Sequence, residues 1–498
     1  MEFPRACGIL LHPTSLPSRF GIGDLGQAAY AFVDFLEESG AKLWQVLPLG
    51  HTSYGDSPYF CVSAFAGNPL LVSPEMLVED GLLDEADLTD VPDFPVNRVD
   101  YGWVIDYKFK LLRKSFDYFQ KQGESRLRDQ FFRFTEDPAT HWWMDDFTLF
   151  MAIKAKHDGK SWLEWEDKYR RRDPRTMEHI RQAEEETIEF QKYMQYLFFR
   201  QWTAVRNYAH EKGIQIIGDI PIFVAMDSAD TWANPDLFYF DSDLHPTVVA
   251  GVPPDYFSQT GQLWGNPLYR WDVNEQHGYY WWIERFKMAF AMYDRIRIDH
   301  FRGFEAYWEI PAGAETAVKG RWVKGPNERL FFAVQQVLGD LPIIAEDLGV
   351  ITPEVECLRD MFDFPGMKIL QFAFDGDPHN AYLPHNHVQN CVVYTGTHDN
   401  ETMMGWFKSL PASDQQYVLE YLNPKTKKDL HWHFVRSALA SVADTVIIPL
   451  QDLLGLGSSA RMNTPSIEKG NWRWRFTEDK LTKPLATRLK KLVTLYGR

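Results

Sequence analysis

Four acidic residues close short apolar segments of the sequence. They are Asp219 in IIGDIP, Asp299 in RIRIDH, Glu346 in IIAEDLG and Asp399 in TGTHDN. If the segments are parallel strands of one barrel, their carboxyl ends lie on one face, which is where such barrels carry their active sites. Two carboxylates in opposed environments are the groups that cleavage of a glycosidic bond requires, one as nucleophile and one as acid.

The segment around Asp299 is built to keep that carboxylate ionised. Side chains alternate along a strand, so Arg297 and Asp299 project to one side while Ile296 and Ile298 face the other. A guanidinium beside a carboxyl favours the charged form, which a nucleophile needs. Glu346 follows Ile343-Ile344-Ala345, where burial would raise its pKa, as a general acid requires.

Other interpretations of these acids remain open. A single acid at a strand end more often caps a helix or pairs with a cation. Acid clusters also hold Mg²⁺ or Ca²⁺, but the adjoining Arg297 and the lack of a phosphate-binding glycine loop disfavour a metal-dependent phosphoryl enzyme. We therefore predict no metal. His12, His300 and His398 also stand at strand ends. His398 suits a hydrogen bond to substrate, while His300 fits a structural role equally well.

The acids must be positioned by strands that alternate with helices. Leu25 to Ser39 has helical periodicity and ends at Gly40, a C-terminal capping signal. Strand and helix alternating eight times predict an α/β protein with a (β/α)8 TIM barrel. A doubly wound open sheet is disfavoured because no G-x-G-x-x-G follows an early strand. The eight predicted strands are Gly8–His12, Lys42–Pro48, Ile214–Pro221, Arg295–His300, Pro342–Leu348, Met367–Phe372, Cys391–Asp399 and Thr445–Leu450.

Long connections predict large insertions after strands 2 and 3 of a single catalytic unit that spans residues 1–498. The first, about residues 55–185, should be mainly helical. The second, about residues 222–290, should be loop-rich. Within it Asn234 to Tyr269 is rich in Pro, Gly, Asp and aromatics, and we expect irregular loop there.

Composition limits the partners and the compartment. A net charge of −17 without a basic stripe argues against nucleic acid. No apolar run reaches the length of a membrane span or a signal peptide core, so we expect a soluble, cytoplasmic protein without a membrane partner. The four cysteines form no C-x-x-C pair and fit reduced structural thiols. Aromatic residues make up 15% of the chain, and any surplus over the cores could line a groove for sugar rings.

An ordered set of motifs resembles the amylomaltase (4-α-glucanotransferase, disproportionating enzyme) family of the α-amylase clan, and it covers nearly the whole chain. The motifs are GILLHPTSLPSRFGIGDLG (8–26), YGDSPY (54–59), GDIPIFVA (218–225), GVPPDYFSQTGQLWGNPLY (251–269), RIDHFRG (297–303), IAEDLG (344–349), GTHDNET (396–402) and RMNTPSIEKGNWRWR (461–475). The resemblance implies a barrel without a C-terminal β-domain, and Leu485 to Arg498 resembles a final barrel helix. No cofactor is implied.

The resemblance also assigns residues. The family's nucleophile falls on Asp299, its general acid/base on Glu346 and its third acid on Asp399. Substrate-binding positions fall on Tyr59, Asp219, Asp255, Gln262, Trp264, Arg297 and His398. Ser466 stands where the family pattern RMNTPG has glycine.

The expected activity is transfer of α-1,4-glucan segments to the 4-hydroxyl of glucose or maltooligosaccharides by a retaining double displacement. An α-amylase-like hydrolase would use the same three acids and differ in the fate of the intermediate. A non-catalytic glucan-binding protein is the remaining alternative. The sequence does not indicate chain-length preference or oligomeric state.

Overall fold

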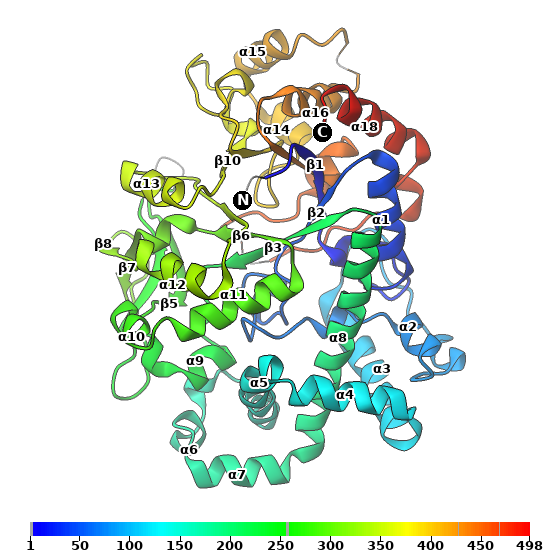
Figure 1. The fold of residues 1–498 in the computed structure, drawn as a ribbon, viewed down its shortest axis with the longest axis vertical. Helices are drawn as coiled ribbons and strands as arrows, with labels where there is room; N and C mark the ends of the chain where they lie inside the picture. The colour runs from blue at the N-terminus through cyan, green and yellow to red at the C-terminus, as the bar shows by residue number, and fades with distance from the viewer. Residues whose placement is uncertain (1–2, 255–257, 427, 468) are drawn as a thin grey trace.

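The computed structural model describes residues 3–254, 258–426, 428–467 and 469–498. Eight parallel strands form the central sheet, in the order β10-β11-β12-β1-β2-β3-β6-β9 (Figure 1). The two outer strands meet where the Ala345 amide donates to the Pro365 carbonyl at 3.0 Å, so the sheet closes as a barrel. Each predicted strand is present, as β1 (Ala6–Leu10), β2 (Leu43–Gln45), β3 (Gln215–Pro221), β6 (Arg295–Asp299), β9 (Ile343–Ala345), β10 (Gly366–Ile369), β11 (Cys391–Tyr394) and β12 (Thr445–Pro449).

Helices cover the outside of the barrel. The first, α1 (Gln27–Ser39), ends as predicted at Gly40, whose φ of 75° suits glycine. It packs against the last helix, α18 (Lys483–Leu495), which confirms a barrel helix at the carboxyl end. The others in this layer are α8 (Glu185–Glu211), α11 (Tyr280–Met292), α12 (Glu328–Leu338), α13 (Pro353–Met361), α14 (Met403–Ser409), α15 (Ala412–Leu422), α16 (Leu430–Ala440) and α17 (Leu450–Leu453).

The chain between β2 and β3 forms a helical layer at one end of the molecule, in the lower part of Figure 1. Asp100 and Asp137 cap two of its helices by accepting backbone N–H bonds, as expected for N-cap residues. These helices are α2 (Pro74–Glu79), α3 (Tyr101–Gln122), α4 (Ser125–Glu136), α5 (Pro138–Lys156), α6 (Asp167–Arg170) and α7 (Pro174–Ala183), followed by α8.

The chain between β3 and β6 differs from the sequence-based expectation. It contains α9 (Ala229–Ala233), β4 (Val248–Val252), β5 (Gln262–Pro267) and α10 (Trp271–Gln276). The two strands join β7 (Ala306–Pro311) and β8 (Arg321–Lys324) in an antiparallel sheet ordered β5-β4-β7-β8. The expectation of irregular loop over Asn234 to Tyr269 is therefore wrong for these strands. The strand β4 also pairs with β7, which follows β6, so local sequence could not reveal that pairing.

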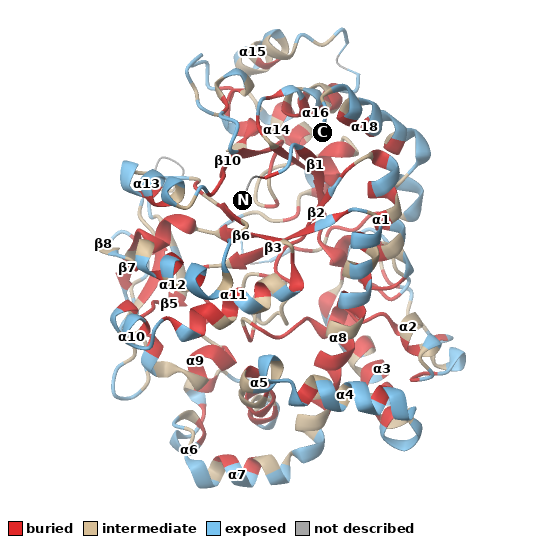
Figure 2. Cartoon of the chain, viewed as in Figure 1, coloured by how far each residue is buried: buried red, intermediate tan, exposed pale blue. Residues whose placement is uncertain are grey.

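The barrel strands are buried, as the red interior of Figure 2 shows. On β6 the side chains of Ile296 and Ile298 are fully buried among apolar neighbours. Arg297 points the other way and is only 4% exposed. The predicted alternation on this strand is confirmed. No helix in the described ranges is both long and apolar enough to cross a membrane.

Candidate active site

Arg297 lies at the centre of the carboxylate cluster. Its Nη1 donates to Asp219 Oδ2 at 2.6 Å, and its Nη2 donates to Asp299 Oδ1 at 2.8 Å. Burial opposes the charge of the guanidinium, but the two carboxylates raise the pKa of Arg297 above its ordinary value. A permanent positive charge therefore stands against Asp299, as the sequence predicts for an ionised nucleophile.

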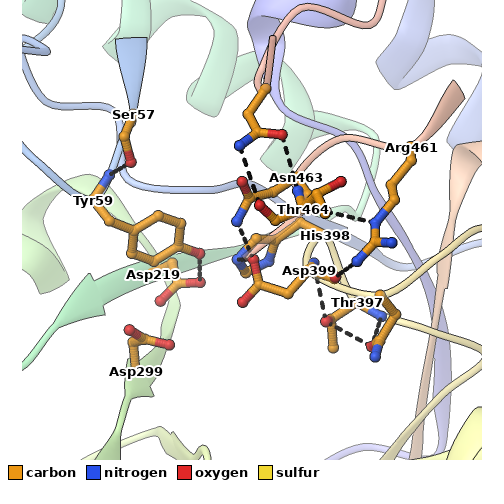
Figure 3. Close-up of polar contacts among 12 residues, drawn as sticks. Ser57, Tyr59, Asp219, Asp299, Thr397, His398, Asp399, Arg461, Asn463 and Thr464 are labelled. Carbon is orange, nitrogen blue, oxygen red and sulfur yellow. Dashed lines mark hydrogen bonds and ion pairs between the residues drawn. The ribbon is translucent and has the colours of Figure 1, made fainter. Parts of the chain in front are cut away.

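Asp219 supports this arrangement from the end of β3. Its Oδ2 also accepts a hydrogen bond from the Tyr59 hydroxyl at 2.8 Å, which Figure 3 shows beside Asp299. Burial raises the pKa of Asp219 to about 7, and the charge of Arg297 opposes that shift. With 1% of its surface exposed, Asp219 holds Arg297 and Tyr59 in place and offers little access to a substrate.

Glu346 follows β9 directly and its carboxyl is held by two backbone amides. The His300 N–H donates to Oε2 at 2.7 Å and the Leu348 N–H donates to Oε1 at 3.1 Å. His300 adopts the left-handed conformation, with φ 56°, immediately after Asp299. The strained turn thus links the ends of β6 and β9.

Burial, reinforced by the charge of Asp299, raises the pKa of Glu346 to about 8, while Arg297 opposes the shift. A carboxyl with this pKa is mostly protonated at neutral pH and can donate a proton, as a general acid must. The predicted contrast between the two carboxyls therefore has a physical basis, one paired with a guanidinium and the other desolvated.

Asp399 lies on a loop, not at a strand end as predicted. The strand β11 ends at Tyr394, and the loop that follows turns on Thr397. Asn463 Nδ2 donates to Asp399 Oδ1 at 2.6 Å, and His398 Nε2 lies 3.2 Å from the same oxygen (Figure 3). Arg461 Nη2 donates to the Asp399 carbonyl at 2.7 Å. The third acid is thus fixed by the segment 461–463.

Aromatic rings cover the cluster on the Tyr59 side. The ring of Tyr59 stacks on His398 with centroids 5.0 Å apart, and Trp472 lies 5.8 Å from each of them. Burial and the nearby Asp219 raise the pKa of the Tyr59 hydroxyl well above its ordinary value, so it stays a donor. Burial lowers the pKa of His398, which favours the neutral ring despite the adjacent Asp399.

Two other predicted binding residues, Gln262 and Trp264, lie on β5. The ring of Trp264 meets His300 edge to face at 4.8 Å, and its Nε1 donates to Gln262 Oε1 at 3.0 Å. Trp264 therefore approaches the acids through His300, and Gln262 orients the indole. Asp255 lies outside the described residues.

Sequence reasoning assigned no individual role to three residues that lie at this site. These are Arg461, Asn463 and Trp472, which all lie in the motif RMNTPSIEKGNWRWR; Trp472 also belongs to the aromatic cluster Trp472-Arg473-Trp474. All four cysteines are free thiols. Over the described residues, no group of three or more His, Cys, Asp or Glu side chains is placed to hold a metal ion.

A closed parallel barrel with an arginine-paired carboxylate beside a half-buried carboxylic acid of raised pKa, both at strand ends, defines a barrel enzyme that acts on glycosidic bonds. A family model described as 4-alpha-glucanotransferase matches residues 11–482. The 4-alpha-glucanotransferase of Thermus thermophilus is 49% identical over 497 residues, which cover 98% of each chain. The chain belongs to the 4-alpha-glucanotransferase family, and it is an enzyme with that activity.

Solved structures agree with this assignment. The amylomaltase from Streptococcus agalactiae, determined in complex with acarbose, superposes with a TM-score of 0.96 at 41% identity and covers 99% of each chain. The amylomaltase from Corynebacterium glutamicum is only 18% identical, with a TM-score of 0.82 over 98% of this chain and 75% of its own. This distant relative therefore shares the fold of the chain.

Proposed function

We propose that this site moves α-1,4-glucan segments to the 4-hydroxyl of glucose or maltooligosaccharides, with Asp299 as nucleophile and Glu346 as acid and base. The observation that carries the proposal is the pairing of Arg297 with Asp299 at 2.8 Å next to a Glu346 whose pKa is raised to about 8. One strand end carries the charged carboxylate and its neighbour carries the proton.

In the first step Asp299 attacks the anomeric carbon of the donor glucan. The bond from that carbon to the glycosidic oxygen breaks, and Glu346 gives its proton to the departing oxygen. The reducing-end fragment leaves, and the rest of the donor is bound covalently to Asp299. Loss of the charge on Asp299 leaves Arg297 paired with Asp219, which keeps the guanidinium in position.

In the second step the ionised Glu346 takes the proton from the 4-hydroxyl of an acceptor sugar. The acceptor oxygen attacks the anomeric carbon from the face opposite Asp299, and the ester bond to Asp299 breaks. Two inversions restore the α configuration. Glu346 regains its proton and Asp299 its charge, so the enzyme returns to its starting state.

Asp399, His398 and Tyr59 are proposed to bind the sugar that carries the reacting carbon. Asn463 donates to Asp399 Oδ1 and not to Oδ2, so Oδ2 can accept hydrogen bonds from sugar hydroxyls. The side chain of Asp399 is 42% exposed, so a ligand can reach it. The acarbose complex of the similar Streptococcus agalactiae amylomaltase supports a sugar site in this fold.

Transfer requires that an acceptor sugar outcompete water for the intermediate. We propose that the insertion at about residues 222–290 forms part of the groove, with Trp264 as a face for the acceptor and Gln262 holding the indole. We propose that Asp255 also contributes to this groove, because it lies in the same motif as Gln262 and Trp264 (251–269). We propose that the insertion at about residues 55–185 is also part of the single catalytic unit, which spans residues 1–498.

Incubation of the enzyme with maltotriose tests the proposal. Transfer gives glucose and a ladder of longer maltooligosaccharides with little gain in reducing ends. Trp264→Ala should lower transfer more than hydrolysis, because the acceptor loses its stacking face while water does not. An increase of reducing ends in step with substrate loss, without longer products, would instead identify a hydrolase.

A further inference from the structure

A second cavity, of about 420 Å³, lies away from the carboxylate cluster. It is bounded by α5 of the helical layer, which packs on α9, and by residues of α10 and α11 (Figure 1). None of Asp299, Glu346 or Asp399 lines it. A volume of this size falls in the range of small-molecule binding sites, about 300–1,000 Å³.

Aromatic rings form one wall of this cavity. Phe65 and Trp142 meet edge to face at 4.7 Å, and Trp142 and Tyr280 are 6.1 Å apart. The Phe65 ring also contacts Trp281 at 5.8 Å, which ties the wall to α11. Tyr280 is 55% exposed, so a ligand can reach its ring. Such faces suit the apolar C–H surface of a pyranose ring.

The cavity is lined by unpaired polar atoms of both kinds. Trp143 Nε1 and Trp281 Nε1 are donors without a partner among the described residues. Asp230 Oδ2 accepts from the Ala64 amide at 2.8 Å. Asn274 is 1% exposed; its Nδ2 donates to Arg270, while its Oδ1 lacks a partner in the described part of the chain. An unpaired buried acceptor is costly, so a hydroxyl donor in the cavity would stabilise the site.

The charges of the lining exclude an anionic ligand. Asp146, Asp230 and Asp236 all line the cavity. Asp146 pairs with Arg172, but the other two carboxylates form no ion pair among the described residues. The ligand must be uncharged or cationic, must form hydrogen bonds and must offer an apolar face to the rings. A neutral polyhydroxyl compound meets these requirements, because its hydroxyl groups bond to the polar atoms and its C–H face packs on the rings.

We infer that this cavity binds a short segment of α-glucan and is a second glucan site of the enzyme, separate from the site of transfer. A long chain held here stays near the active site when its reacting end dissociates, which raises its effective concentration there. A trisaccharide is too short to gain in this way. The cavity therefore favours long donors and leaves short ones unaffected.

The first test compares donors of different length. Tyr280→Ala removes an exposed ring of the wall, and Phe332→Ala on α12 is a matched control, because Phe332 is 46% exposed and lies outside the cavity. We expect Tyr280→Ala to raise the KM for amylose at least fivefold and to leave kcat/KM for maltotriose within twofold of the parent enzyme. An unchanged KM for amylose, or an equal loss with Phe332→Ala, would overturn the inference.

The second test counts binding sites directly. Calorimetric titration of Asp299→Asn with maltoheptaose should give two sites, and the additional change Tyr280→Ala should give one. This assay rests on the proposed role of Asp299, because the variant must bind maltoheptaose without converting it. Chromatography of the titrated sugar checks for residual turnover. Turnover would reject the role of Asp299 as nucleophile, and it would not reject the second site. A single site before Tyr280→Ala, or a site filled by tetramethylammonium and not by maltoheptaose, would contradict a glucan pocket.

Discussion

The two sides of the active site are constructed differently. Asp299 and Glu346 stand at the ends of neighbouring strands β6 and β9, and their carboxyls bind groups fixed by the barrel, the Arg297 side chain and the His300 and Leu348 amides. Asp399 lies on a loop beyond β11 and is held by Asn463 from another loop. The two groups proposed to exchange bonds and protons are thus held at the ends of barrel strands.

This difference matches the demands on each side. A nucleophile and an acid must keep their geometry while charge moves between them, and strands provide that precision. A residue that binds hydroxyl groups must admit and release a sugar ring, and a loop allows this. We therefore expect substitutions on the barrel side to change kcat most and substitutions on the loop side to change KM and stability as well.

The largest effect is expected from Asp299→Asn, which keeps the shape of the side chain and removes the proposed nucleophile. Loss of a covalent nucleophile lowers kcat by about 10⁴-fold or more. Glucan affinity should change by less than fivefold, because the neighbouring acids and aromatic rings remain. Steady-state kinetics and equilibrium binding of maltoheptaose measure the two quantities. Near-normal kcat in this variant would refute the assignment.

The raised pKa of Glu346 predicts that both activity and stability depend on pH. Its pKa of about 8 in the folded enzyme exceeds the ordinary 4.5, so the acid form persists through neutral pH and is lost as pH rises through about 8. The value of kcat/KM for maltotriose should fall tenfold per pH unit above that point. The folded state also binds this proton more tightly than the unfolded chain, so the free energy of unfolding should fall between pH 4.5 and about 8 from this group.

A flat profile of kcat/KM from pH 7 to pH 10 in a folded enzyme would argue against Glu346 as the acid. Circular dichroism over the same range separates loss of the proton from loss of the fold. Gln416→Ala, an exposed change on α15, serves as a control whose profile should match that of the parent enzyme.

On the loop side, Asn463→Ala should have a smaller effect. It removes the 2.6 Å hydrogen bond to Asp399, and a hydrogen bond to a charged group contributes about 1.5–3 kcal/mol. We expect kcat/KM to fall by roughly tenfold to a hundredfold, partly through KM, because Asp399 loses its orientation. A loss as large as that of Asp299→Asn would mean that Asn463 takes part in the chemistry itself.

The smallest expected effect is a gain in stability. Ser466 has φ 67°, in the left-handed region, on the exposed loop that follows Asn463. The left-handed conformation costs a residue with a side chain about 1–2 kcal/mol, and glycine adopts it freely. Ser466→Gly should therefore raise the free energy of unfolding by about 1 kcal/mol, measured by urea denaturation, with kcat unchanged. A decrease would show that the serine side chain stabilises this loop.

The barrel could be predicted because its signals are local. The alternation at Arg297 and Asp299 and the run Ile343-Ile344-Ala345 before Glu346 lie within single strands. The sheet that contains β4 and β5 escaped prediction because it is completed by pairing of β4 with β7, which follows the next barrel strand. The bond from Asn463 to Asp399 joins residues on separate loops, and no periodicity encodes such a contact.

The loop position of Asp399 shows the same limit. The apolar run from Cys391 suggested a strand that continues to the acid, but the Asn400 side chain accepts from the Thr397 amide and hydroxyl and turns the chain after Tyr394. A side chain that bonds to nearby backbone competes with strand pairing.

Trapping of the covalent intermediate tests the central claim most directly. In Glu346→Gln the acid and base are absent, but an α-maltosyl fluoride donor needs no proton to release fluoride, so the first step proceeds while the second stalls. Mass spectrometry of the digested enzyme should find a maltosyl group esterified to Asp299. A label on Asp219 or Asp399, or release of fluoride without any labelled enzyme, would contradict the mechanism.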